Sequence, residues 1–295
     1  MRHRSGGAHA AQLPVLAGVV LAAAALAGIA WGIVRAVGGS TDDSPPPPPP
    51  TASIPTKPVL RIVFPEGFTR EEMAKRVAEV NEIAKKKRKV RPKLSRRAYL
   101  RATRSGPVPR EFANENLPNL EGFLFPATYE FTADTTSRSL VRKQLEAFAR
   151  NWKQVDLSYA RSKNLTAYDV LIIASMVEEE VLAPRERSLV AAVIYNRLHL
   201  GMTLGIDATI RYGLGVPPSE SLRQSQLHDP TPYNTRIHAG LPPTPISNPG
   251  LAAIQAAAHP AKVKYLFFVR KADCKTHFFT ARKAEFDARV AGPRC

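Results

Sequence analysis

The feature that most constrains the fold of this chain is an apolar segment, residues 171–177, followed by three consecutive glutamates. At about 100° per residue in a helix, Glu180 lies on the same face as Ile173, Met176 and Val177. A carboxyl group held among apolar side chains loses hydration, which raises its pKa. A carboxyl group that stays protonated near neutral pH can donate a proton to a leaving group. The segment therefore predicts a core helix that ends in an acid/base glutamate; the alternative is a solvated helix end with three acids.

The N-terminus and the net charge bear on the cellular compartment. The chain has 295 residues and a formal net charge of +17, which predicts an anionic partner. Arg2, His3 and Arg4 precede an uncharged, mostly apolar stretch that ends before Arg35. Its length suits a bilayer-spanning helix, and the basic residues before it place the N-terminus in the cytoplasm. We expect residues 1–12 to be cytoplasmic and residues 13–37 to form a single-pass anchor, with a cleaved signal peptide as the alternative.

Residues 38–58 are rich in glycine, serine and proline and include six consecutive prolines. Such a segment forms no core, and polyproline is extended and semi-rigid. We therefore expect a linker that separates the folded part from the membrane.

Folded sequence is expected from about residue 59 onward. Residues 59–64 alternate like a strand, and Thr69 is a plausible N-cap for a helix that runs towards Lys85. The basic run that follows, residues 85–97, is interpreted as a solvated surface loop or as a contact with an anionic polymer or lipid headgroups. No aromatic residue interrupts it, which argues against stacking on nucleic acid bases.

The rest of the chain alternates predicted helices with short strands, so the fold class expected is α+β. A loop over residues 120–132 leads into a strand, and residues 265–269 and 277–280 are expected to pair as strands. Thr166 is the expected N-cap of the helix that carries Glu180. The other predicted helices span residues 137–152, 184–201, 207–212, 251–258 and 281–290. Residues 229–249 are rich in proline and read as a long loop, which in a compact domain is usually functional.

Several short blocks in this order resemble the YceG-like (MltG) family of membrane-anchored endolytic murein transglycosylases. The blocks are Glu121-Gly122 with Phe125-Pro126, Ala174 to Glu180, Glu186-Arg187 with Val190, Asn196-Arg197-Leu198 with Gly201-Met202, Asp207 with Thr209 and Tyr212-Gly213, Pro232 to Thr235, Gly240 to Pro243 with Pro249-Gly250, Ala256 to Ala261, and Tyr265 to Val269. Each block is weak alone, and together they are specific.

The resemblance implies a small LysM-like strand–helix lobe over residues 59–120 and a mainly helical catalytic domain with a short β-sheet over residues 121–295. It implies an enzyme, a lyase that cleaves β-1,4 bonds between N-acetylmuramic acid and N-acetylglucosamine within peptidoglycan strands. The products are 1,6-anhydro ends, and the cut limits the length of nascent glycan. The catalytic domain is then periplasmic and anchored in the inner membrane, with cell-wall synthesis or division proteins as candidate partners and no nucleic acid.

Carried over residue by residue, the family's catalytic glutamate is Glu180. Glu178 is the other acid of that block and points about 160° away on a regular helix. A lytic transglycosylase suits a single carboxyl group, because the muramic C6 hydroxyl replaces water as the nucleophile. Glu180 then first protonates the glycosidic oxygen and later accepts the hydroxyl proton.

The candidate substrate-binding residues are Glu178, Asn196, Arg197, Asp207, Tyr233 and Asn234. Asn196 and Arg197 either orient sugar or peptide groups or serve as a helix cap and a surface ion pair. Tyr233 and Asn234 suit a saccharide-binding wall, with core packing as the alternative for Tyr233. Asp207 either stabilises positive charge at the anomeric carbon or holds a turn. We expect no metal and no cofactor, because the sequence holds neither a metal-ligand spacing nor a phosphate-binding glycine loop.

Two departures from the family pattern are visible, a shortened region before residue 59 and Ala208 where proline is common. The shortening weakens any glycan-binding role of the N-terminal lobe. The competing functions are a non-enzymatic, membrane-tethered binder of cell-wall polymer and, less well supported, a pyridoxal-phosphate lyase acting on a chorismate derivative.

Cys274 and Cys295 are the two cysteines of the chain. In an extracytoplasmic chain they are expected to form one disulfide that ties down the C-terminus.

Overall fold

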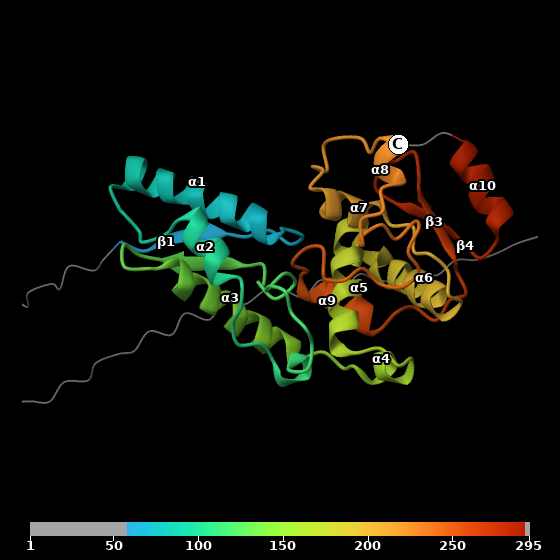
Figure 1. Ribbon diagram of the computed structural model, residues 1–295, viewed down its shortest axis with the longest axis horizontal. Helices are drawn as coiled ribbons and strands as arrows, with labels where there is room; N and C mark the ends of the chain where they lie inside the picture. Colours follow the sequence, from blue (N-terminus) through green and yellow to red (C-terminus); the bar gives the residue numbers. More distant parts are fainter. Residues whose placement is uncertain (1–57, 293–295) are drawn as a thin grey trace, which may run out of the picture. The chain divides into compact units, whose positions relative to one another are not determined.

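A computed structural model describes residues 58–292, which form an α+β fold of helices with two short antiparallel sheets (Figure 1). The predicted α+β class is thereby confirmed. We call residues 58–152 the N-terminal lobe. Its elements are β1 (Leu60–Val63), α1 (Arg70–Arg88), α2 (Arg96–Ala102), the 3₁₀ turn η1 (Arg110–Phe112), β2 (Thr128–Phe131) and α3 (Ser137–Trp152).

β1 and β2 form the sheet of the N-terminal lobe. They pair antiparallel, with Ile62 opposite Tyr129, and both of these side chains are buried while their neighbours along the strands are exposed. An unpaired strand leaves its backbone N–H and C=O groups without hydrogen-bond partners in the protein, so β1 depends on β2 to form a stable sheet. The boundary predicted after residue 120 lies between these two strands in the chain, and α3 packs on α2.

The first turn of α1 is closed by the predicted N-cap. The Thr69 hydroxyl accepts a hydrogen bond from the Glu72 N–H at 3.2 Å, and the Glu72 carboxylate accepts one from the Thr69 N–H at 2.8 Å. This reciprocal capping box satisfies two helix-end donors. The helix start is therefore determined by the local sequence.

The basic run begins as helix and not as the predicted loop. Lys85, Lys86, Lys87 and Arg88 form the last turn of α1, and Lys89 closes it with a left-handed backbone at φ 56°. Cations at a helix C-terminus interact favourably with the exposed carbonyl groups there. This interaction stabilises the last turn of α1, where the density of positive charge alone had predicted a loop.

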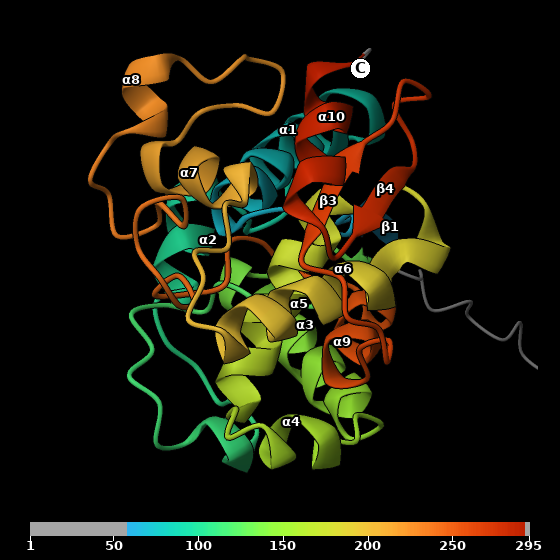
Figure 2. The same cartoon turned by 90° about the vertical axis from the view of Figure 1, so that its right-hand side faces the viewer.

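The second part of the chain is built around α5, which packs against α6, α7 and α9 (Figure 2). α5 covers Ala167–Glu180, as predicted, and its N-cap Thr166 accepts from the backbone N–H groups of Tyr168 and Asp169. The surrounding elements are α4 (Ser158–Ser162), η2 (Pro184–Glu186), α6 (Arg187–His199), α7 (Asp207–Leu214), α8 (Gln224–Leu227) and α9 (Leu251–Ala258). Residues 229–249 form the predicted long loop without a helix or an extended strand.

The chain closes with a β-hairpin and a helix. β3 (Phe267–Arg270) and β4 (His277–Thr280) pair antiparallel, with Arg270 opposite His277, and α10 (Lys283–Ala291) packs on both strands. The predicted strand pairing is confirmed.

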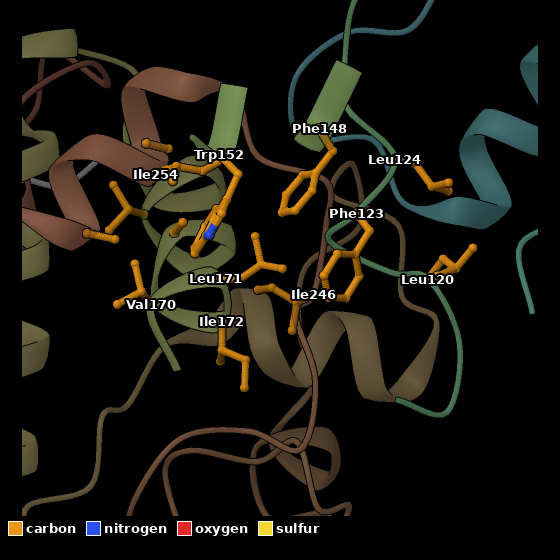
Figure 3. Packing of buried hydrophobic residues seen from close by; sticks show 14 of the residues in the cluster. Leu120, Phe123, Leu124, Phe148, Trp152, Val170, Leu171, Ile172, Ile246 and Ile254 are labelled. Atoms are coloured by element: carbon orange, nitrogen blue, oxygen red, sulfur yellow. The ribbon is translucent and has the colours of Figure 1, made fainter. Parts of the chain in front are cut away.

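The core joins the N-terminal lobe to α5. Phe112 and Phe123 meet edge to face with centroids 4.9 Å apart, and Phe148 stacks on Trp152 at 5.5 Å. Figure 3 shows Phe123, Phe148 and Trp152 near Leu171 of α5, which is fully buried. Truncating such a ring to alanine costs about 3–5 kcal/mol, so the core holds α5 firmly against the lobe.

Two predictions concern residues that lie outside the described part of the chain. The anchor expected at residues 13–37 is one of them, and among the described helices none is long and apolar enough to cross a bilayer. Cys295, the expected partner of Cys274, is the other. Cys274 itself lies in the turn between β3 and β4 with a left-handed backbone at φ 58°.

Candidate active site

Glu180 is the last residue of α5, and it is partly buried there. Burial and, to a smaller extent, the neighbouring carboxylate of Asp207 raise the pKa of its carboxyl group to about 7, while Arg270, Arg211 and Arg236 oppose the shift. The carbonyl groups at a helix C-terminus also disfavour a negative charge. A carboxyl group with a pKa near 7 exchanges protons in both directions at neutral pH, which is the requirement for one residue that acts first as an acid and then as a base.

Arg270 reaches Glu180 from the end of β3. Its guanidinium donates to the backbone carbonyl of Glu180 at 3.3 Å. The hairpin that carries Arg270 is held by a buried contact between His277 Nδ1 and Glu186 Oε2 at 2.8 Å, and the backbone N–H of His277 also donates to Glu186. Since His277 stands opposite Arg270 in the sheet, this contact determines where the arginine lies.

α7 supplies the charges on another side of Glu180. Asp207 is the first residue of α7 and pairs with Arg236 at 2.7 Å. Arg211, one turn later, donates to the carbonyl oxygens of Pro217 and Glu220 at 2.9 and 2.6 Å. The structure therefore brings together Glu180 and Asp207, both predicted site residues, with three arginines that sequence analysis did not identify.

The other two glutamates of the α5 terminus have different surroundings. The Glu178 carboxylate accepts a hydrogen bond from the backbone N–H of Gly250 at 2.9 Å, at the start of α9, and burial raises its pKa. Burial raises the pKa of Glu179 to about 7 although its carboxylate is hydrogen-bonded by Ser247. Glu178 and Glu179 thus bind the loop before α9, on a different side of α5 from the charges around Glu180.

Asn196 and Arg197 of α6 bind backbone carbonyl groups. The Asn196 side-chain amide donates to Val263 and Tyr265 at 2.9 and 2.8 Å. The Arg197 guanidinium donates to Leu266 at 2.5 Å and to Thr203 and Leu204, and it lies 5.1 Å from the centre of the Phe267 ring. These donors fasten the segment that leads into β3. This geometry favours a structural role over the predicted substrate contact, and it matches neither the helix cap nor the ion pair considered as the alternative.

Tyr233 and Asn234 stabilise the long loop. The buried Asn234 amide donates to the carbonyl oxygens of Leu227 and Asp229 at 3.1 and 2.8 Å, which favours a structural role for it. Tyr233 is partly exposed; its hydroxyl is 2.8 Å from that of Thr244, and its ring lies 5.1 Å from that of Tyr212. Tyr233 therefore remains a candidate residue for the saccharide-binding wall.

Glu121 is a buried carboxylate that sequence analysis quoted only as part of a motif. It accepts hydrogen bonds from the Arg70 backbone N–H at 3.0 Å, the Asn248 amide at 2.7 Å and the Tyr212 hydroxyl at 3.1 Å. Burial raises its pKa to about 7 despite these donors. Glu121 thus connects the start of α1 to α7 and to the loop before α9.

The residues that sequence analysis missed are Glu121, Arg211, Arg236 and Arg270. Glu121 had a usable signal, because an acid beside a glycine in a loop dense with aromatic residues has few solvated positions. The three arginines had none, since arginine is abundant in this chain and nothing local distinguishes them.

Comparisons with known proteins decide the family. The family model described as "YceG-like family" matches residues 51–292. The chain belongs to the YceG-like family. A crystal structure of a yceG-like protein from Listeria monocytogenes superposes with a TM-score of 0.65 at 27% identity, covering 79% of this chain and 76% of that one.

Two relatives of this YceG-like protein carry a functional name. The endolytic murein transglycosylase of Bacillus subtilis (strain 168) is 30% identical over 233 residues, which are 78% of this chain and 64% of the relative. The endolytic murein transglycosylase of Streptococcus pneumoniae serotype 2 (strain D39 / NCTC 7466) is 32% identical over 256 residues, 80% of this chain and 45% of the relative. The YceG-like chain thus spans between about half and two thirds of the length of these relatives.

Proposed function

We propose that this YceG-like protein is an endolytic murein transglycosylase that cleaves the β-1,4 bond between N-acetylmuramic acid and N-acetylglucosamine with Glu180. The observation that carries the proposal is the environment of Glu180, whose pKa burial raises to about 7 at the end of the central helix. Two relatives with this family's sequence are named for that activity.

The chemistry follows from one carboxyl group. Protonated Glu180 donates its proton to the glycosidic oxygen, and the bond from the anomeric carbon to that oxygen breaks. The C6 hydroxyl of the same muramic residue attacks the anomeric carbon, the 1,6-anhydro ring closes, and the Glu180 carboxylate accepts the hydroxyl proton. The enzyme returns to its starting protonation state, and no water is consumed.

The charges around Glu180 suit both halves of this cycle. Asp207 and burial favour the protonated form that donates, and the three arginines stabilise the carboxylate that remains after donation. The arginine charges also limit the rise of the pKa, so that the carboxylate is accessible at neutral pH. Asp207 is paired with Arg236, and its negative charge is available to the positive charge that develops at the anomeric carbon.

We further propose that the protein is anchored by residues 13–37 in the cytoplasmic membrane, with the part after residue 58 on the outer side. The support is the uncharged segment preceded by Arg2 and Arg4 and followed by a proline-rich spacer. Peptidoglycan lies on that side of the membrane, so this topology brings the enzyme to its substrate.

The proposed activity is tested by digesting purified sacculi and analysing the products by mass spectrometry. We expect new 1,6-anhydro-muramic ends within strands for the wild type, and a loss larger than roughly 10²–10⁴-fold for Glu180→Gln, because no second group takes over the proton transfers. Glu178→Gln is the matched control, since it removes a carboxylate two residues away that binds Gly250. Full activity of Glu180→Gln together with loss in Glu178→Gln would reverse the assignment, and no cleavage by the wild type would favour the non-enzymatic polymer binder.

A further inference from the structure

A groove on the N-terminal lobe is lined by five arginines. It has a volume of about 740 Å³ and lies against the start of α1 and along α2, with Arg70, Arg96, Arg97, Arg101 and Arg104 around it. One acidic side chain, Glu71, lines the groove as well, and it is already paired with Arg96 at 3.0 Å. The groove therefore carries a strong excess of positive charge.

Three of these arginines form a stripe of like charge. Arg97, Arg101 and Arg104 follow each other at spacings of four and three residues, and all three are exposed. Within residues 58–292 no side-chain partner is found for any of them. Arg97 and Arg101 lie four residues apart on α2, where like charges repel and destabilise a helix, and Arg104 adds a third positive charge just after the helix ends.

The remaining two arginines are held in place. The Arg70 guanidinium donates to the Thr103 hydroxyl at 3.1 Å and to the Leu100 carbonyl at 3.5 Å. α2 is fixed by Tyr99, whose buried hydroxyl donates to Gln144 of α3 at 2.7 Å. The groove thus presents guanidinium groups on a rigid wall, and guanidinium forks match carboxylates in shape and charge.

The groove is connected to the active site through the Glu121 contacts. Arg70 donates its backbone N–H to Glu121, and Glu121 accepts from Tyr212 of α7. On α7, Asp207 lies five residues before Tyr212, roughly 7.5 Å along the helix axis.

We propose that this groove binds the carboxylates of the stem peptides carried by the glycan strand, at a position away from the bond that Glu180 cleaves; the inference rests on the proposed function. Stem peptides are spaced along peptidoglycan and end in free carboxylates. A strand bound in both places is held across the site, which favours cleavage within strands over cleavage at their ends.

The test is a binding measurement that does not depend on cleavage. Full-length protein with Glu180→Gln is sedimented with purified sacculi, and its Kd is compared with that of a groove variant that adds Arg97→Ala, Arg101→Ala and Arg104→Ala. The charge-matched control adds Lys86→Ala, Lys87→Ala and Arg88→Ala, at the other end of α1. We expect the groove variant to raise the Kd about tenfold and the control to change it less than twofold.

Chemical amidation of the stem carboxylates identifies the ligand. We expect amidated sacculi to bind the Glu180→Gln protein about as weakly as native sacculi bind the groove variant, with no further loss when both changes are combined. A second variant, with Arg97→Lys, Arg101→Lys and Arg104→Lys, keeps the positive charge but lacks the planar guanidinium groups. We expect its Kd for native sacculi to lie between that of the Glu180→Gln protein and that of the groove variant.

Three results would overturn the inference. The first is a groove variant and a control variant that bind sacculi with equal Kd, and the second is amidation that weakens sacculus binding by the groove variant as much as it weakens binding by the Glu180→Gln protein. The third is a groove variant that loses binding to phosphatidylglycerol vesicles but still binds sacculi normally. The last result would assign the groove to the membrane surface. Because cleavage by the wild type is scored separately, an intact activity with a failed groove rejects only this inference, and an inactive wild type rejects the proposed function.

Discussion

Three adjacent glutamates at one helix end have three different environments. Glu178 binds the N-terminus of α9, Glu179 binds Ser247, and Glu180 faces Asp207 and three arginines. The assignment of Glu180 therefore depends both on its burial and on the charges around it. A carboxylate committed to a backbone N–H is a poor proton shuttle, because giving up that bond costs free energy.

The pH dependence of the reaction tests these neighbours. Since protonated Glu180 is the form that donates, kcat/KM should fall about tenfold per pH unit above the pKa near 7. Asp207→Asn removes a charge that raises this pKa and should move the fall to lower pH. Arg270→Gln removes a charge that lowers it and should move the fall to higher pH. The check is a profile of kcat/KM against pH on soluble glycan strands, and shifts in the same direction for both variants would contradict the assignment.

At the scale of elements, η2 and α6 position the β3–β4 hairpin. Asn196 and Arg197 fasten the chain that enters β3, and Glu186 accepts two hydrogen bonds from His277 of β4. The hairpin in turn brings Arg270 to Glu180. Asn196 and Arg197, which were predicted as candidate substrate contacts, thus hold the segment that leads into the hairpin.

Removing one partner of the buried Glu186–His277 contact should destabilise the fold. His277→Ala leaves the Glu186 carboxylate buried with one fewer donor, and we expect the free energy of unfolding to fall by about 3 kcal/mol. Lys275→Ala, in the exposed turn of the same hairpin, should change it by less than about 0.5 kcal/mol. Urea denaturation measures both, and equal losses in the two variants would show that the contact is not important for stability.

Local signals were sufficient for the starts of α1 and α5 but not for the site. Thr69 and Thr166 identify two helix starts because a capping side chain and its target lie within three residues. The Glu186–His277 contact joins residues 91 positions apart, and no local pattern indicates it. The same holds for Arg270, whose distance from Glu180 depends on where the hairpin packs.

For the whole molecule, raised carboxyl pKa values link stability to pH. Burial raises the pKa of Glu121, Glu179 and Glu180 to about 7, well above the value of about 4.3 expected in the unfolded chain. The folded state therefore binds protons more tightly, so this contribution to stability is fully present below the unfolded pKa and is lost as the pH rises through 7.

The protein should accordingly melt at a higher temperature near pH 5.5 than near pH 8. Glu121→Gln removes one of the three titrating groups and should reduce the difference between the two melting temperatures. Thermal unfolding at both pH values is the measurement. A melting temperature that is equal or higher near pH 8 would show that these glutamates are not held in the protonated state on folding.

The fold class predicted from the sequence is confirmed. The order of the short motifs indicated the α+β fold and the family, although some motifs, such as Pro232 to Thr235, lie in loops and not in helices or strands. The pairing of β1 with β2 was not predicted, since the partner of β1 lies 65 or more residues away in the chain and only the folded structure reveals it. The loop predicted at the start of the basic run was wrong for a similar reason. Lys85 to Arg88 form the last turn of α1, where the helix C-terminus stabilises their positive charges, and the charge pattern alone does not indicate this.

The central claim is that Glu180 works alone, with the substrate's own C6 hydroxyl as the nucleophile. That hydroxyl is already close to the anomeric carbon, and intramolecular attack can be worth effective molarities of about 10⁵ M or more, so bulk water competes poorly. The most direct measurement is digestion of sacculi in ¹⁸O-water followed by mass spectrometry of the new glycan ends. We predict 1,6-anhydro-muramic ends without ¹⁸O; reducing muramic acid that carries ¹⁸O would contradict this claim and would require a second carboxylate, Glu178 or Asp207.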